Sequence, residues 1–108
     1  MNFYEHTFIA KKDLPESQIK KLIQKYTDIV SQNSGKVLKT EEWGLRVLSH
    51  DIKNNNKGFY FHFKIEGNGQ TVDALEKAEN IDSTLIRFLT VKVKKHNLET
   101  NYFEKKEG

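Results

Sequence analysis

Glu41 and Glu42 are adjacent carboxylates in a segment that we predict to be a strand. Paired carboxylates are common general acids and bases, but neighbouring residues of a strand point to opposite faces of a sheet. The two side chains would therefore not act on one substrate. No serine stands in the Gly-x-Ser-x-Gly sequence of a nucleophile elbow. The sequence favours a solvated pair of glutamates and predicts no enzyme.

Metal binding is the second chemistry that the residue types permit, because the chain has four histidines. They are His6, His50, His62 and His96, and no two of them stand four residues apart. We consider that His50 and His62 could approach each other across a strand hairpin, which would supply two metal ligands without a clear third. Structural zinc usually has four ligands, so ordinary sheet or surface histidines are favoured. We expect no metal and no cofactor.

Nucleic-acid binding has a partial signal in Lys57-Gly58-Phe59-Tyr60-Phe61, which begins like the third-strand motif of RNA recognition motifs. Tyr60 stands where that motif has a small residue, and Lys64 stands where its last aromatic belongs. We therefore interpret the segment as a core strand with lysine and glycine in the turn before it. Lys92, Lys94 and Lys95 form a basic group at another predicted strand end, where lysines also protect sheet edges.

Composition limits the class of protein. The chain has 108 residues, a formal charge of +3 and 18 basic residues, of which only Arg46 and Arg87 are arginines. That charge permits binding to a polyanion without requiring it. The absence of cysteine favours a reducing cytosolic setting. No segment approaches the roughly 20 apolar residues of a membrane span.

A helix follows Asp13, because apolar residues recur there at helical spacing. Asp13 is expected to cap the helix with Glu16 completing a capping box, and Gly35 to end it as a left-handed cap. The stripe consists of Ile19, Leu22, Ile23, Tyr26, Ile29 and Val30.

Strands are predicted over 3–10, 37–53, 59–66 and 85–94, with a bulge at Gly44 and a turn over 54–58. A second helix is marked by Val72, Leu75 and Ala78. The order βαββαβ predicts a ferredoxin-like α+β fold, with two helices on one face of a four-stranded antiparallel sheet. We place this domain at 1–95 and a polar tail at 96–108.

The sheet face opposite the helices is unusually apolar in this prediction. In the last strand we place Ile86 and Phe88 on one face and Leu89, Val91 and Val93 on the other. Because helices cover one face only, the second face would expose apolar side chains to water. Either these are tolerated surface residues, or a protein partner covers them.

Several segments in order resemble the family of the sixth protein of the bacterial small ribosomal subunit. The longest runs from Glu42 to Lys53 and contains the Trp-Gly-x-Arg part of the family's pattern. The other matches are Tyr4-Glu5, Asp13-Leu14, Gly58-Phe59-Tyr60 and the strand around Arg87. The resemblance extends over about residues 2–95.

The resemblance implies a structural constituent of the ribosome, with no catalysis and no cofactor. It implies binding to the central domain of 16S ribosomal RNA, as a heterodimer with the eighteenth small-subunit protein. The ribosome would be cytoplasmic, or that of an organelle. The alternative from the fold alone is a ligand-sensing or regulatory module that dimerises through its open sheet face.

Residue roles follow from the resemblance and from side-chain chemistry. Arginine pairs bidentately with phosphate, so Arg46 and Arg87 are the leading RNA-binding candidates. The alternatives are ion pairs, of Arg46 with Glu41 or Glu42, and of Arg87 with Asp82 or Glu5. Further RNA candidates are Tyr4, Lys53, Lys92 and Lys94, of which Lys92 and Lys94 would extend a positive stripe from Arg87 along one strand. Candidates for the protein-partner surface are Trp43, Tyr60, Leu89 and Val91, although Trp43 could instead cover the bulge.

Overall fold

The computed structural model describes residues 2–52 and 55–95, and the expected βαββαβ order is confirmed. Among these residues no helix is long and apolar enough to cross a membrane. The predicted tail lies outside the described residues. The elements are β1 (Asn2–Lys11), α1 (Glu16–Gln32), β2 (Lys36–Ile52), β3 (Asn55–Gly67), α2 (Gly69–Asn80) and β4 (Leu85–Val93).

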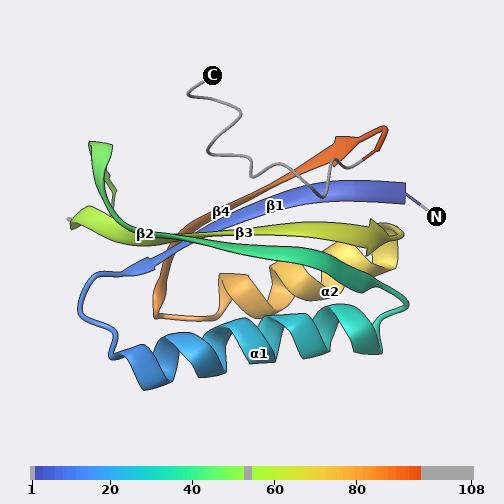
Figure 1. Ribbon diagram of the computed structural model, residues 1–108, viewed down its shortest axis with the longest axis horizontal. Coiled ribbons are helices and arrows are strands. Elements are labelled where there is room, and N and C mark those ends of the chain that lie inside the picture. Colours follow the sequence, from blue (N-terminus) through green and yellow to red (C-terminus); the bar gives the residue numbers. More distant parts are fainter. Residues whose placement is uncertain (1, 53–54, 96–108) are drawn as a thin grey trace.

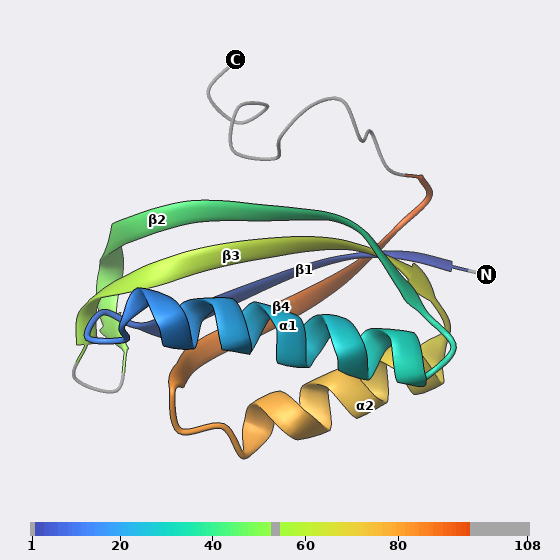
Figure 2. The ribbon, with the colours of Figure 1, turned by 60° about the horizontal axis from the view of Figure 1, so that its bottom comes forward.

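The four strands form one antiparallel sheet in the order β2-β3-β1-β4, which places β2 and β4 at its edges. Both helices lie on the same side of the sheet (Figure 1), and the turned view shows them side by side beneath the strands (Figure 2). The predicted ferredoxin-like fold is therefore confirmed. The side of the sheet without helices is called the open face below.

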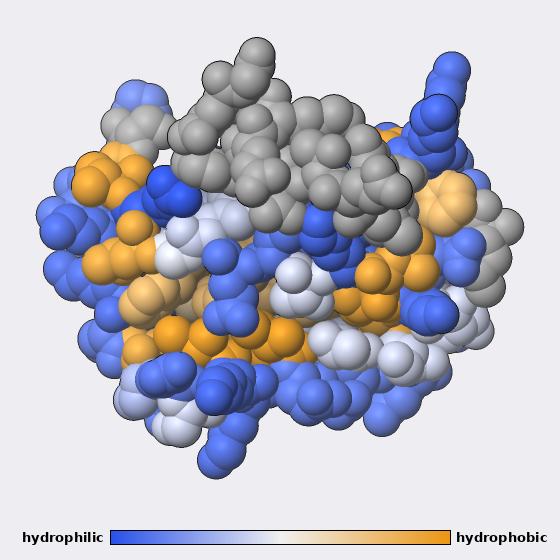
Figure 3. All heavy atoms as spheres, in the orientation of Figure 1, coloured by the Kyte–Doolittle hydropathy of each residue, from blue (hydrophilic) through white to orange (hydrophobic). Residues whose placement is uncertain are grey.

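The main core lies between the sheet and the helices, and aromatic rings fill its centre. Phe8 is fully buried, and its ring lies 5.1 Å from both Phe61 and Phe63 and 5.5 Å from Tyr26, measured between ring centroids. Two of these contacts are edge-on and one is stacked, which are favourable arrangements for aromatic pairs. Figure 3 shows the apolar band between the strands and α1, with hydrophilic side chains on either side.

The start of α1 differs from the prediction. The helix begins at Glu16 after Pro15, whose backbone is extended, and no side chain caps it. A capping box from Asp13 would need a helix that begins at Leu14, but proline disfavours a helical conformation in the residue before it. The predicted Asp13 cap is therefore wrong, and Glu16 stabilises the first turn by its charge alone.

The end of α1 also differs, because Ser34 and not Gly35 has the left-handed backbone, with φ of 64°. Gly35 is required for a different reason. A Cβ at this position would lie 2.4 Å from Cγ2 of Thr71 and 3.0 Å from Cγ1 of Val30. Glycine thus allows the start of β2 to pass close to both helices, a contact that the sequence does not reveal.

The start of α2 has a capping box that was not predicted. The Asn68 side chain accepts a hydrogen bond from the Thr71 amide at 3.1 Å, and the Thr71 hydroxyl accepts one from the Asn68 amide at 3.1 Å. The usual pattern has Glu or Gln at the second position, so threonine there gave no signal.

Two glycines mark the irregular pairing of β2 with β3. The predicted bulge is confirmed, because Gly44 has φ of 81° and the register shifts between Glu42 and Gly44. The predicted turn over 54–58 is too long, because β3 begins at Asn55. Gly58 pairs with Lys11 on one side and Arg46 on the other, so it lies inside the sheet.

The faces of β4 are partly wrong in the prediction. The register shifts beside Ala10, which pairs with Leu85 while Ile9 pairs with Arg87. This irregularity places Ile86 in an apolar cluster on the open face, whereas Phe88 packs against the main core. Ile86 and Phe88 therefore lie on opposite faces, because an extra residue in a strand shifts the alternation of its side chains.

Candidate interaction surface on the open face

The strand register defines which side chains share the open face. In β1 these are Phe3, Glu5, Thr7 and Ile9, and in β3 they are Tyr60, His62 and Lys64, which alternate with the core aromatics. Arg87 pairs with Ile9, Leu89 with Thr7 and Val91 with Glu5, so the same face continues onto the edge strand β4.

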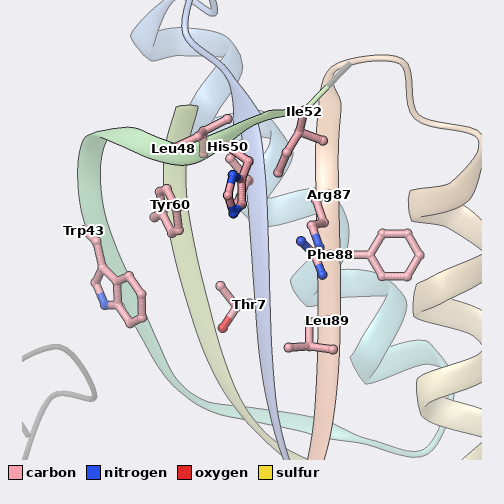
Figure 4. A pocket seen from close by; sticks show the side chains of 10 residues that line it. Thr7, Trp43, Leu48, His50, Ile52, Tyr60, Arg87, Phe88 and Leu89 are labelled. Atoms are coloured by element: carbon pink, nitrogen blue, oxygen red, sulfur yellow. The ribbon is translucent and has the colours of Figure 1, made fainter. Parts of the chain in front are cut away.

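A small apolar cluster lies at one end of the open face. Ile9, Leu48 and Ile86 are buried in it, and Ile52 and Tyr60 pack against them. Leu48 and Ile52 come from the last part of β2, which turns across the other strands toward β4 (Figure 4). This turn of β2 is what encloses the cluster.

A pocket of about 360 Å³ opens beside this cluster. Figure 4 shows Thr7, Tyr60, Arg87 and Leu89 around it, while the Phe88 ring points away toward the helices. The pocket thus joins side chains of all four strands. Its lining is Thr7, Ile9, Trp43, Leu48, His50, Ile52, Tyr60, Arg87, Phe88 and Leu89.

Trp43 forms the wall of the pocket on the β2 side. Its ring stacks on Tyr60 at 6.0 Å and on His62 at 5.5 Å between centroids, with interplanar angles of 14° and 12°. The indole Nε1 donates a hydrogen bond to Glu41 Oε1 at 3.0 Å. These contacts hold the half-buried Trp43 ring in a fixed position on the open face.

His62 lies at the centre of a polar cluster on this face. Its Nδ1 is 2.8 Å from the Thr7 hydroxyl and its Nε2 is 3.0 Å from Glu5 Oε1. Because a carboxylate can only accept, Nε2 carries the hydrogen, and Nδ1 of a neutral ring accepts from Thr7. Burial lowers the pKa of His62 and outweighs the hydrogen bond from His62 to Glu5 and the charges of Glu5 and Glu41, which raise it.

This pKa predicts a loss of stability in acid. A histidine whose pKa is lowered on folding binds its proton more weakly in the folded state, so stability is lost as pH falls below the unfolded value of 6.5. We expect His62→Gln to flatten the dependence of the free energy of unfolding on pH between about 5 and 6.5. Urea titrations at several pH values will measure this dependence.

His50→Gln is the matched control, because the side chain of His50 is exposed on β2. Its pH dependence should follow the wild type below about pH 6.5. If His62→Gln also follows the wild type, His62 does not protonate differently in the folded and unfolded chains.

His50 and His62, which were considered as two metal ligands across the strand hairpin, do not come together. His62 pairs with Glu41 across β2 and β3, and its ring nitrogens bind Thr7 and Glu5. Within residues 2–52 and 55–95 there is no group of three or more His, Cys, Asp or Glu side chains that could hold a metal.

The four predicted partner-surface residues lie on one face. Leu89 and Val91 are 56% and 49% exposed, which is high for large apolar side chains, and Leu89 lines the pocket. Tyr60 and Trp43 are half-buried and stacked on each other. The pocket brings together Trp43 and Leu89, which are 46 positions apart in the chain.

The two arginines lie on opposite edge strands. Arg87 is exposed on β4, and among the described residues it has no ion pair, since Asp82 pairs with Lys25 and Glu5 with His62. Arg46 is half-buried on β2, where its Nε donates to the Trp43 carbonyl at 3.2 Å. The two guanidinium groups thus do not form one basic patch.

The other RNA candidates are also separated. Lys92 pairs with Tyr4, so it points to the opposite face from Arg87, and Lys94 follows the end of the strand. The expected continuous positive stripe along β4 is therefore wrong. The Tyr4 ring is buried in the main core, which removes it from the surface candidates. Lys53 lies outside the described residues.

Six of the ten residues that line the pocket were not predicted as site residues. Leu48, His50 and Ile52 alternate in β2 and so share one face, which was a usable signal. Their approach to β4 depends on the turn of β2 across the sheet. Ile86 was assigned to the wrong face because the register shift beside it has no signature in the sequence.

Comparison with known proteins gives a consistent result. A family model described as Ribosomal protein S6 matches residues 3–92. The chain is 53% identical to the small ribosomal subunit protein bS6 of Pelagibacter ubique over 107 residues, which cover 99% of this chain and 88% of that protein. It is 38% identical to bS6 of Zymomonas mobilis over 96 residues, covering 89% and 77% of the two chains.

A solved structure agrees. The crystal structure of 30S ribosomal protein S6 from Thermotoga maritima matches with a TM-score of 0.80 and 28% identity, covering 98% of this chain and 94% of that one. The family match extends over both the helix layer and the open face. The chain therefore belongs to the ribosomal protein S6 family, whose proteins are structural components of the small ribosomal subunit and not enzymes.

Proposed function

We propose that the chain binds the central domain of 16S ribosomal RNA together with the eighteenth small-subunit protein, which covers its open face. The observation that carries the proposal is the mainly apolar pocket, which exposed Leu89 lines, with exposed Val91 further along the same face of β4. Exposed apolar side chains around a pocket, with polar residues beside them, are typical of protein-interaction sites. We place the ribosome in the cytoplasm or in an organelle.

The pocket has the properties of a site for an anchoring side chain. Trp43 and Tyr60 are held by stacking, so they lose little conformational freedom when a partner binds. Tryptophan and tyrosine are also the residues most often found in binding hot spots. Because the family consists of ribosomal proteins, this face is better explained by a ribosomal partner than by a ligand-sensing module.

For RNA binding we propose Arg87 as the main contact. Lys92, on the opposite face of β4, and Lys94, which follows the strand, are weaker and separate candidates. Arg87 is exposed and has no ion pair among the described residues, so its guanidinium can take a phosphate without breaking an internal contact. Its position beside the pocket places it at the border of the proposed partner surface. Arg46, on the other edge strand, is a separate and weaker candidate. Lys53, outside the described residues, stays a candidate from the sequence alone.

Arg87→Ala should weaken binding to the RNA in the presence of the partner. Each lost phosphate contact lowers the slope of log affinity against log salt concentration by about one unit. Arg87→Lys should restore the charge without the bidentate geometry, and so restore affinity only in part. The measurement is a series of binding isotherms at several salt concentrations, with the eighteenth small-subunit protein bound.

Lys77→Ala is the matched control, because Lys77 is an exposed cation in the last turn of α2, in the helix layer. It should leave the salt slope unchanged. If the salt dependence of the affinity is the same for Arg87→Ala and the wild type, Arg87 does not contact the RNA. Failure of the wild type to bind the RNA–partner complex would reject the proposed function itself.

A further inference from the structure

A buried polar chain connects three elements on the helix side of the sheet. His6 of β1 is fully buried, and its Nδ1 lies 2.6 Å from the Thr90 hydroxyl of β4. Its Nε2 lies 2.9 Å from Oε2 and 2.7 Å from Oε1 of Glu79 in α2. The Thr90 hydroxyl also donates to Glu76 Oε2 at 2.9 Å. The interaction surface proposed above uses none of these groups.

The hydrogen positions in this chain follow from the donors available. A hydroxyl has a single hydrogen, and Thr90 donates it to the Glu76 carboxylate. Thr90 must therefore accept from His6, so Nδ1 carries a hydrogen. The contact between Nε2 and Glu79 then requires one more proton, because a bare Nε2 and a carboxylate would face each other with lone pairs only.

The surroundings make loss of that proton costly. Glu79 is 2% exposed, and its Oε1 has no other hydrogen-bond partner among the described residues. The rings of Phe8 and Phe88 lie 5.8 Å and 6.2 Å from the imidazole. Glu76 and Asp82 add negative charge near Glu79, and Tyr26 of α1 is close enough for the charge of Glu79 to raise its pKa. A buried carboxylate without a donor in such a site is strongly unfavourable.

We propose that His6 and Glu79 share one proton and act as a pH-sensitive latch that holds α2 and the edge strand β4 against β1. The latch is closed while the pair contains one proton in addition to the hydrogen on Nδ1. It opens when that proton leaves, because the lone pairs of Nε2 and the carboxylate then repel. Thr90 lies between Leu89 and Val91 in sequence, so the latch fixes β4 from the side opposite those two residues.

The proton count gives the sign of the pH dependence. In the unfolded chain, histidine and glutamate titrate near about 6.5 and 4.3. Between these two pH values the unfolded His6 and Glu79 also hold one such proton. The latch therefore does not make the free energy of unfolding depend on pH in this range. Above about 6.5 the unfolded pair is empty while the folded pair keeps its proton, so stability falls as pH rises. The direction agrees with the effect of burial, which raises the pKa of Glu79 despite the opposing His6 contact.

Glu79→Gln tests the proposal, because the glutamine amide can donate to Nε2 without an added proton. In that variant the folded His6 is neutral. The free energy of unfolding of the variant therefore falls in acid, where the histidine of the unfolded chain becomes charged. The unfolding constant of the wild type divided by that of the variant should therefore rise about tenfold per pH unit. Urea titrations from about pH 5 to 7.5 will measure this ratio, and contributions from His50 and His62 cancel in it.

Glu76→Gln is the matched control, since its amide oxygen can still accept from Thr90. The corresponding ratio for this variant should stay constant across the range. A constant ratio for Glu79→Gln would overturn the proposal.

Nitrogen-15 shifts of the wild-type His6 ring provide a second measurement that needs no variant. We expect Nδ1 to stay protonated and the ring to show no titration over the same pH range. A His6 ring that titrates there like a free imidazole would show that the pair does not hold a constant proton.

Discussion

Replacing Phe8 with alanine should lower the free energy of unfolding by about 3–5 kcal/mol, the largest loss that we expect from one substitution in this chain. Phe8 is fully buried at the centre of the main core, in contact with Phe61, Phe63 and Tyr26. The substitution removes the apolar area of the ring, leaves a cavity and breaks three aromatic contacts. Small domains have a total stability of about 5–15 kcal/mol, so the variant should be marginally folded.

Urea unfolding followed by circular dichroism will measure this loss. Phe3→Ala is the matched control, because Phe3 lies on the same strand but is half-buried on the open face. Its loss should be clearly smaller, with an unchanged dependence on denaturant. A loss below about 1 kcal/mol for Phe8→Ala would mean that the core closes around the missing ring.

Replacing Leu89 with aspartate should leave the isolated chain folded and weaken binding of the eighteenth small-subunit protein by roughly 30-fold or more, or about 2 kcal/mol. Leu89 is 56% exposed beside the pocket, so a carboxylate there remains solvated in the free protein. In the proposed complex the same carboxylate would be buried against an apolar surface without a partner, which is unfavourable. Isothermal titration calorimetry will measure the change in affinity.

Ile81→Asp is the matched control for this substitution. Ile81 is 87% exposed directly after α2, on the helix side of the sheet. The change of residue type is similar, but binding should stay at the wild-type level. If both variants bind as tightly as the wild type, the partner does not cover β4 and another part of the surface must be sought.

Much of the fold could be predicted from the sequence, because it rests on local patterns. The stripe around Leu22 and Tyr26 requires a helix, and the alternation of Phe61 and Phe63 with His62 requires a half-covered strand. The bulge at Gly44 could also be predicted, since glycine alone takes its φ of 81° at no steric cost. The resemblance carried by the segment from Glu42 to Lys53 also indicates the family from the sequence alone.

The sites depended on contacts between segments that are distant in sequence. The turn of β2 that brings Ile52 to Arg87, and the register shift that moves Ile86 to the open face, have no local signature. The pairing of His6 with Glu79 across 73 positions is of the same kind. Local patterns determine which way a side chain points within its own strand or helix. Only the packed tertiary structure determines which distant side chain it meets, because that meeting depends on registers and turns that the whole core fixes together.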